Sequence, residues 1–106
     1  MVKDNSLDAQ ENGKKYARFE HNFVDAWEGT EKEFSFRFAK PTKTQIKMMQ
    51  KTAVKDAAQA AQNLLVNIIH PDEKEALLSA ADEYPGLITS FAGGIIKAVG
   101  IADLGN

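Results

Sequence analysis

The hydrophobic residues of this chain follow two different periods, and the change falls near Pro41. Before it, apolar and polar residues alternate, and in Glu33 to Ala39 three phenylalanines occupy every second position. Such alternation places the three rings on one face of a β-strand. After Pro41 the apolar residues recur every three or four positions, which is typical of amphipathic helices. The pattern predicts an α+β domain that is mostly helical, with an N-terminal β-hairpin followed by a bundle of about four α-helices.

The partner of the phenylalanine strand is predicted to be the segment from Tyr16 to Trp27. Apolar and polar residues alternate there too, and Glu28-Gly29-Thr30 can turn the chain between the two strands. Phe19, Phe23 and Trp27 also fit one face of a helix, so this segment is open to both interpretations. We favour the hairpin, because the phenylalanine strand would otherwise have no neighbour within reach.

Four helices are predicted after Pro41. The first begins at a capping box formed by Thr42 and Gln45. The second covers Ala57 to Ile68, and a short third helix follows up to about Glu83. The fourth is opened by Pro85 and closed by Gly100, as the preferences of proline and glycine for helix ends predict.

The fourth helix, from Tyr84 to Gly100, is apolar around most of its circumference. A helix of this kind has to be covered, either by the rest of its own bundle or by a partner protein. Two glycines, Gly93 and Gly94, lie inside it, and each costs roughly 1 kcal/mol relative to alanine. Close helix packing and a hinge are the two explanations that we consider for them.

The length of 106 residues predicts a single domain. The polar stretch 1–15 predicts a flexible N-terminal arm, because it contains few large aliphatic residues. Within the domain we expect a β-hairpin at 16–40, a helical bundle at 41–100 and a short tail at 101–106.

Composition excludes several classes of function. A net charge of -2 gives no reason to expect non-specific nucleic-acid binding, and the absence of cysteine excludes disulfides and thiolate metal sites. The two histidines are far apart in sequence, and no nucleophile, base and orienting group can be assembled, so we expect no metal, no cofactor, no catalytic residue and no enzymatic activity. The N-terminus has no apolar run of the signal-peptide kind, and the fourth helix is a poor membrane span. A cytoplasmic protein is expected.

The first predicted helix has a basic face. Five lysines recur there every three or four positions, at Lys40, Lys43, Lys47, Lys51 and Lys55. The face is either simply solvated or meets an acidic protein surface or a nucleic-acid backbone. Because no arginine or aromatic residue lies between the lysines, the nucleic-acid interpretation is the weaker one.

The order of these segments resembles the small tail assembly chaperones of long-tailed bacteriophages and phage-like elements. The resemblance covers roughly Phe23 to Gly100. Its most specific parts are the turn Phe38-Ala39-Lys40-Pro41-Thr42 and the helix start Glu83-Tyr84-Pro85-Gly86-Leu87. The sequence departs from the family in its longer arm before Tyr16 and in Ala39, where a second lysine is expected.

The resemblance implies a role without catalysis. Proteins of this kind coat the helical tape measure protein in the host bacterial cytoplasm, keep it soluble before the tail tube polymerises around it, and are absent from the mature virion. The implied partner is therefore the tape measure protein, with the tail tube protein as a further candidate, and neither nucleic acid nor a membrane is expected. An amphipathic partner helix would lie on the fourth helix, at Leu87, Ile88, Phe91, Ile95 and Ile96.

Self-association is also expected. Lysines of the first helix can face acidic residues near the third helix in a head-to-tail arrangement, which generates rings or spirals. The candidate residues are Lys43, Lys47 and Lys51 on one side and Asp72, Glu73 and Glu75 on the other.

Two other classes of function fit the same composition. The first is a structural tail component or another small phage-encoded protein-interaction or regulatory module. A structural component would be present in purified particles. A DNA-binding regulator is the second, and it would use the basic face from Lys40 to Lys55, with binding that weakens steeply as salt rises.

Overall fold

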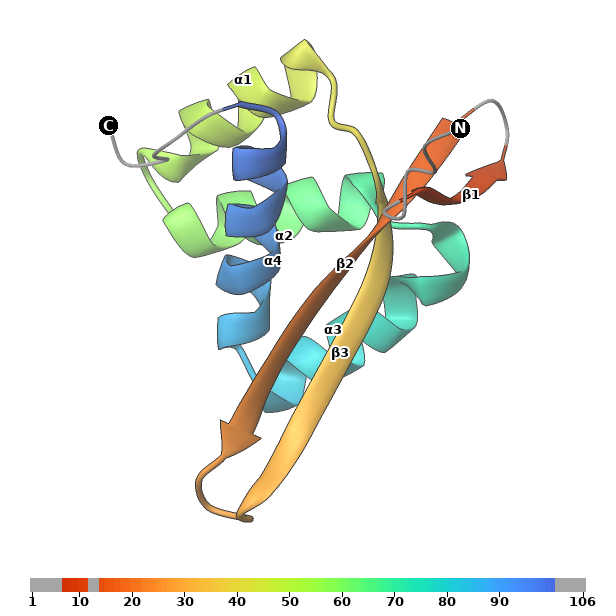
Figure 1. Cartoon of the computed structure of the whole chain (residues 1–106). Helices are drawn as coiled ribbons and strands as arrows, with labels where there is room; N and C mark the ends of the chain where they lie inside the picture. Colours follow the sequence, from red (N-terminus) through yellow and green to blue (C-terminus); the bar gives the residue numbers. More distant parts are fainter. Residues whose placement is uncertain (1–6, 12–13, 101–106) are drawn as a thin grey trace.

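A computed structural model describes residues 7–11 and 14–100 of the chain. Within these residues, three strands are followed by four α-helices and one short 3-10 helix (Figure 1). The elements are β1 (Leu7–Glu11), β2 (Lys14–Asp25), β3 (Thr30–Ala39), α1 (Lys43–Ala53), α2 (Ala57–Ile68), η1 (Pro71–Glu73), α3 (Lys74–Glu83) and α4 (Gly86–Ala98). This architecture confirms the predicted α+β class, with a hairpin that precedes a group of helices.

Strands β2 and β3 form a long antiparallel hairpin, in which Tyr16 pairs with Ala39 at one end and Asp25 with Thr30 at the other. The hairpin interpretation of the segment before Trp27 is therefore confirmed. Gly29 makes the turn, with a φ of 71° and an N–H that donates to the Asp25 carbonyl at 2.7 Å. A positive φ of this size favours glycine over any residue that carries a Cβ. The tip of the hairpin projects beyond the helices (Figure 1).

A third strand differs from the prediction. Residues 1–15 were expected to form a flexible arm, yet Leu7–Glu11 is a strand that pairs antiparallel with the start of β2, and β2 itself begins at Lys14. The sheet order is β1-β2-β3. The segment forms a strand because its backbone pairs with β2, and its polar composition gives no sign of that pairing. The rest of the predicted arm before Leu7 and the predicted tail at 101–106 lie outside the described residues.

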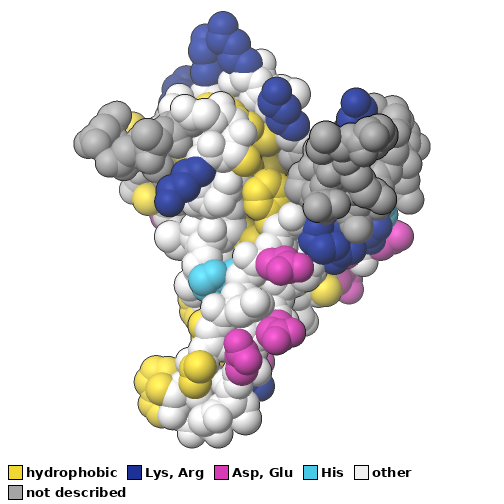
Figure 2. Space-filling view, viewed as in Figure 1, with side chains coloured by type: hydrophobic (Ala, Val, Ile, Leu, Met, Phe, Trp, Pro, Cys, Tyr) yellow, Lys and Arg dark blue, Asp and Glu magenta, His cyan; other side chains and the backbone are white. Residues whose placement is uncertain are grey.

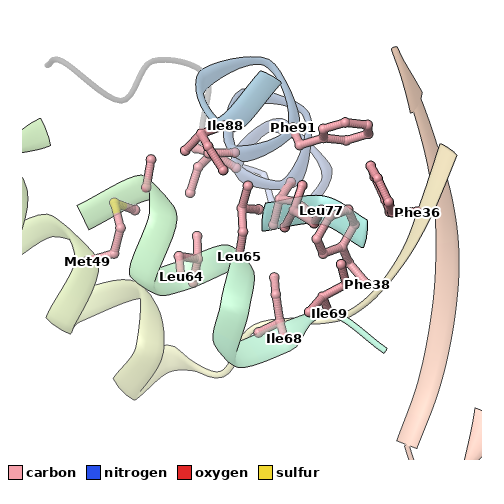
Figure 3. Close-up of a cluster of buried hydrophobic side chains, with 14 of the residues drawn as sticks. Phe36, Phe38, Met49, Leu64, Leu65, Ile68, Ile69, Leu77, Ile88 and Phe91 are labelled. Atoms are coloured by element: carbon pink, nitrogen blue, oxygen red, sulfur yellow. The ribbon is translucent and has the colours of Figure 1, made fainter. Parts of the chain in front are cut away.

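The core lies between the inner face of the hairpin and the helices (Figure 3). Phe36 and Phe38 point from β3 toward Phe91 of α4, with ring centroids 5.4 Å and 5.7 Å from the Phe91 ring. Leu65 of α2 and Leu77 of α3 are completely buried behind them. The alternating phenylalanines therefore face the apolar side of the helices, as their period predicts.

Helix α1 packs chiefly on α2. Its start is the predicted capping box: the Gln45 N–H donates to the Thr42 hydroxyl at 3.1 Å, and the Thr42 N–H donates to the Gln45 side chain at 2.8 Å. Met49 is its one buried residue. Among the described residues, none of the helices has the length and apolar character needed to cross a membrane.

Candidate protein-binding surfaces

The five residues predicted to contact a partner are all in the core. Their exposed fractions lie between 1% and 6%, and they are Leu87, Ile88, Phe91, Ile95 and Ile96. Helix α2 and the inner face of the hairpin cover the apolar sides of α4, so this helix is satisfied within its own chain. The prediction of an accessible contact surface on α4 is therefore wrong for this conformation. The helix is covered by its own chain, which is the first of the two interpretations of its apolar surface.

The glycines of α4 do not serve close packing. A methyl group added at Gly93 would meet no atom of a neighbouring element within 4 Å, and one added at Gly94 would lie 3.7 Å from the Phe19 ring, which is an ordinary contact. No neighbouring element approaches closely enough to require a glycine at either position. The hinge explanation therefore stays a prediction, whereas close packing is excluded.

The charged residues predicted for self-association are only partly available. Lys43, Lys47 and Lys51 are exposed on α1, and Asp72 and Glu75 are exposed near the start of α3. Glu73 is different. Its carboxylate accepts hydrogen bonds from the backbone N–H and the side-chain Nε of Arg37, at 2.7 Å and 3.1 Å. This carboxylate fastens η1 to the edge of β3, so both of its oxygens already accept hydrogen bonds within the chain.

A clamp holds the tip of the hairpin against the junction of α3 and α4. One Asp25 carboxylate oxygen accepts the N–H groups of Trp27 and Glu28, at 2.9 Å and 3.1 Å. The other accepts the Tyr84 hydroxyl at 2.7 Å. The hydrogen bond from Tyr84 is the largest cause of a lowered Asp25 pKa, and the same bond raises the pKa of Tyr84. The clamp thus stabilises both the ionised carboxylate and the neutral phenol.

Sequence reasoning missed this clamp. An aspartate four residues before a glycine is a recognisable turn signal. Its partner Tyr84 is 59 residues away in the sequence, and no local pattern connects the two.

The clamped turn displays two apolar side chains. Trp27 is 95% exposed and Val24 is 66% exposed, which is unusual for residues of their size. Figure 2 shows hydrophobic side chains at this lower end of the hairpin. Beside Trp27 is an open hollow of about 460 Å³ that includes His21, Phe23 and Tyr84 in its wall. We call Trp27 and Val24 the hairpin tip.

A groove lies between the start of β2 and the end of α4. It has a volume of about 340 Å³, and Phe19, Ile95 and Val99 contribute to its apolar wall, with Lys15 and Lys40 beside them. Figure 2 shows a strip of hydrophobic side chains between these elements, with basic side chains near it. No acidic residue is present among the described residues that line it. We call it the β2–α4 groove.

A second apolar hollow lies between α1 and α2. Its volume is about 240 Å³, and its wall includes Met48, Met49 and Leu64, with the amides of Asn63 and Asn67 beside them. Met48 is 60% exposed. We call this hollow the methionine hollow. Lys47 and Lys51 are exposed on the same helix, so basic charge lies next to an apolar surface.

The described part of the chain offers no group of three or more histidine, cysteine, aspartate or glutamate side chains that could hold a metal ion. Two contacts between ionisable side chains, Asp25 with Tyr84 and Arg37 with Glu73, fasten one element to another. The apolar surfaces described above are the candidates for contact with another protein.

Comparison with known proteins shows the family. A family model described as a domain of unknown function, DUF6848, matches residues 10–106. The chain belongs to the DUF6848 family. A solved structure, that of the uncharacterised protein rbstp2171 from Bacillus stearothermophilus, is 30% identical to this DUF6848 chain, with a TM-score of 0.67, and the match covers 81% of this chain and 83% of that chain. The search of curated proteins finds no match. The similarity thus extends over most of both chains, and it concerns fold and family.

Proposed function

We propose that this DUF6848 protein is a tail assembly chaperone without enzymatic activity, which binds a phage tape measure protein and keeps it soluble while the tail tube assembles. The observation that carries the proposal is the methionine hollow. It replaces the buried face of α4 as the contact surface. Its apolar wall, polar edge and neighbouring lysines suit an amphipathic helix that carries acidic residues beside its apolar stripe.

Methionine suits a chaperone of this kind. Its side chain is unbranched and polarisable, so it adapts to partners of different shape. A tape measure protein presents a long series of helical surfaces that differ in detail, and each bound copy of the chaperone has to accept a different one. Two adjacent methionines, one exposed and one buried, provide an adaptable surface of that type.

The position of α1 also supports the proposal. Because α1 packs chiefly on α2, a partner helix can enter between them without disturbing the contacts among α2, α4 and the hairpin. The packing among α2, α4 and the hairpin would therefore stay in place while the hollow widens.

The test is co-expression with the tape measure protein of the same phage element. Met48→Glu places a charge at the exposed edge of the methionine hollow, and Val54→Glu is its matched control, because Val54 is 86% exposed and does not line the hollow. We expect the wild-type protein and Val54→Glu to keep the tape measure protein in the soluble fraction, and Met48→Glu to lose at least about tenfold in binding. Equal binding by a folded Met48→Glu variant would contradict the proposal.

The proposal also locates the protein. A chaperone acts in the host cytoplasm and leaves before the virion is complete, whereas a structural tail component stays. Mass spectrometry of purified particles separates the two, and we expect this protein to be absent from them.

A further inference from the structure

The two ends of the β2–β3 hairpin differ in charge. From Glu20 to Glu33 the sequence contains five carboxylates and one lysine, and that lysine, Lys32, pairs with Glu28 at 3.1 Å. Exposed carboxylates at Glu20, Glu31 and Glu33 therefore accompany the apolar hairpin tip. Figure 2 shows acidic side chains along the lower part of the hairpin.

The opposite end of the hairpin has the complementary character. There the β2–α4 groove is apolar, Lys15 and Lys40 line it, and no acidic residue occurs between Lys40 and Lys55 in the sequence. Basic side chains gather in the upper part of the face that Figure 2 shows. One end of the molecule thus displays an apolar projection with negative charge, and the other an apolar recess with positive charge.

The tip and the groove of one molecule cannot meet. Strand β2 has 12 residues, which at a rise of about 3.3 Å per residue separates its ends by roughly 36–40 Å. The hairpin tip of the same molecule therefore does not occupy the groove. Its volume of about 340 Å³ is enough for one large aromatic side chain and part of its turn, and Trp27 is 95% exposed at a rigid, clamped turn.

We propose that the β2–α4 groove binds the hairpin tip of a second copy of this chain. The Trp27 side chain enters the groove, Val24 covers its edge, and the carboxylates of the hairpin face Lys15 and Lys40. The contact joins two different surfaces, so each added copy leaves one free tip and one free groove. Contacts of this type build rings or open spirals. Self-association of this kind does not require that the chain binds a tape measure protein.

Trp27 is the single tryptophan of the chain, so its fluorescence reports directly on the contact. We expect the emission maximum of the wild-type protein to move to shorter wavelength as its concentration rises from about 1 μM to about 1 mM, the range in which a small interface binds. Higher salt should weaken the shift, because exposed charges are screened. The proposal would be overturned if the emission maximum remained at the wavelength of a solvent-exposed tryptophan at every concentration.

Mixing of two variants tests the direction of the contact. Trp27→Ala removes the projection and keeps the groove, whereas Ala98→Glu places a carboxylate in the wall of the groove and keeps the tip. Val54→Ala is the control for loss of an exposed hydrophobic side chain elsewhere. Circular dichroism first establishes that each variant is folded.

In sedimentation velocity we expect each single variant to stay monomeric, the control to associate like the wild type, and the mixture of the two variants to form a dimer and nothing larger. The dimer forms because the tip of Ala98→Glu still fits the groove of Trp27→Ala. Association of either variant alone, or a mixture that stays monomeric, would overturn the proposal. Both variants should retain binding to a tape measure protein through the methionine hollow, so failure of this contact and failure of the proposed function are distinguishable.

Discussion

At the scale of single residues, the clamp between Asp25 and Tyr84 makes a prediction about pH. The Asp25 pKa in the folded protein lies below its ordinary value of 3.8. The unfolded chain therefore binds a proton at higher pH than the folded chain does. The resulting stabilisation is complete above the unfolded pKa and is lost as the pH falls through the folded value.

The variant Tyr84→Phe removes the largest cause of that lowered pKa. We expect it to melt a few degrees below the wild type at neutral pH, and the difference to narrow below about pH 3, where the carboxyl of Asp25 is increasingly protonated in both proteins. Differential scanning calorimetry from acid to neutral pH measures both melting temperatures.

Asp25→Asn and the double variant Asp25→Asn/Tyr84→Phe complete a double-mutant cycle of unfolding free energies. Because Tyr84 acts through Asp25, the two substitutions should be clearly non-additive. Additive effects, or a Tyr84→Phe difference that grows as the pH falls, would contradict the clamp.

At the scale of elements, the fold could be predicted from the sequence to a greater extent than the candidate site could. Local sequence patterns predicted three features: the alternating phenylalanines of β3, the capping box of α1 and the ends of α4. Each of these patterns is compatible with one local structure. The ambiguous segment before Trp27 was resolved by the need of β3 for a neighbour. Strand β1 was missed, because pairing with β2 and not its own composition makes it a strand.

The candidate site was harder to predict than the fold, because the sequence does not reveal which apolar side of a helix the rest of the chain will cover. Most of the circumference of α4 is apolar in the sequence, yet six of its apolar residues are buried against the rest of the chain. Met48 and Trp27 looked unremarkable in sequence and prove to be exposed. Exposure of this sort depends on long-range packing, which local periodicity does not contain.

Phe91→Ala tests the assignment of α4 to the core. Phe91 is 2% exposed and lies against Phe36 and Phe38, so its truncation should lower the free energy of unfolding by about 3–5 kcal/mol. That is a large part of the roughly 5–15 kcal/mol that stabilises a typical domain. Urea unfolding followed by circular dichroism measures it, and a loss below about 1 kcal/mol would contradict the core assignment.

Gly93→Ala tests the hinge. Because a methyl group at this position meets no atom of a neighbouring element within 4 Å, the substitution should raise the free energy of unfolding by about 1 kcal/mol through better helix propensity. The same urea experiment measures the gain. A variant that is more stable but no longer solubilises the tape measure protein would show that α4 must bend in function, whereas unchanged binding would exclude the hinge.

At the scale of the whole molecule, charge and apolar surface are arranged along one direction. Basic charge lies on α1 and at the start of β2, and acidic charge lies along the projecting hairpin. The net charge of -2 conceals this polarity, because the positive charge of one end nearly cancels the negative charge of the other. In the proposed assembly, successive copies follow one another tip to groove, and their methionine hollows are presented repeatedly to a long helical partner.

The measurement that tests this account most directly is the molar mass of the complex formed on co-expression with the tape measure protein. Size exclusion with light scattering gives that mass. We predict co-elution of several copies of the 11.7 kDa chain with each tape measure chain, and loss of the complex with Met48→Glu. An insoluble tape measure protein and a DUF6848 protein that elutes alone would contradict the chaperone function.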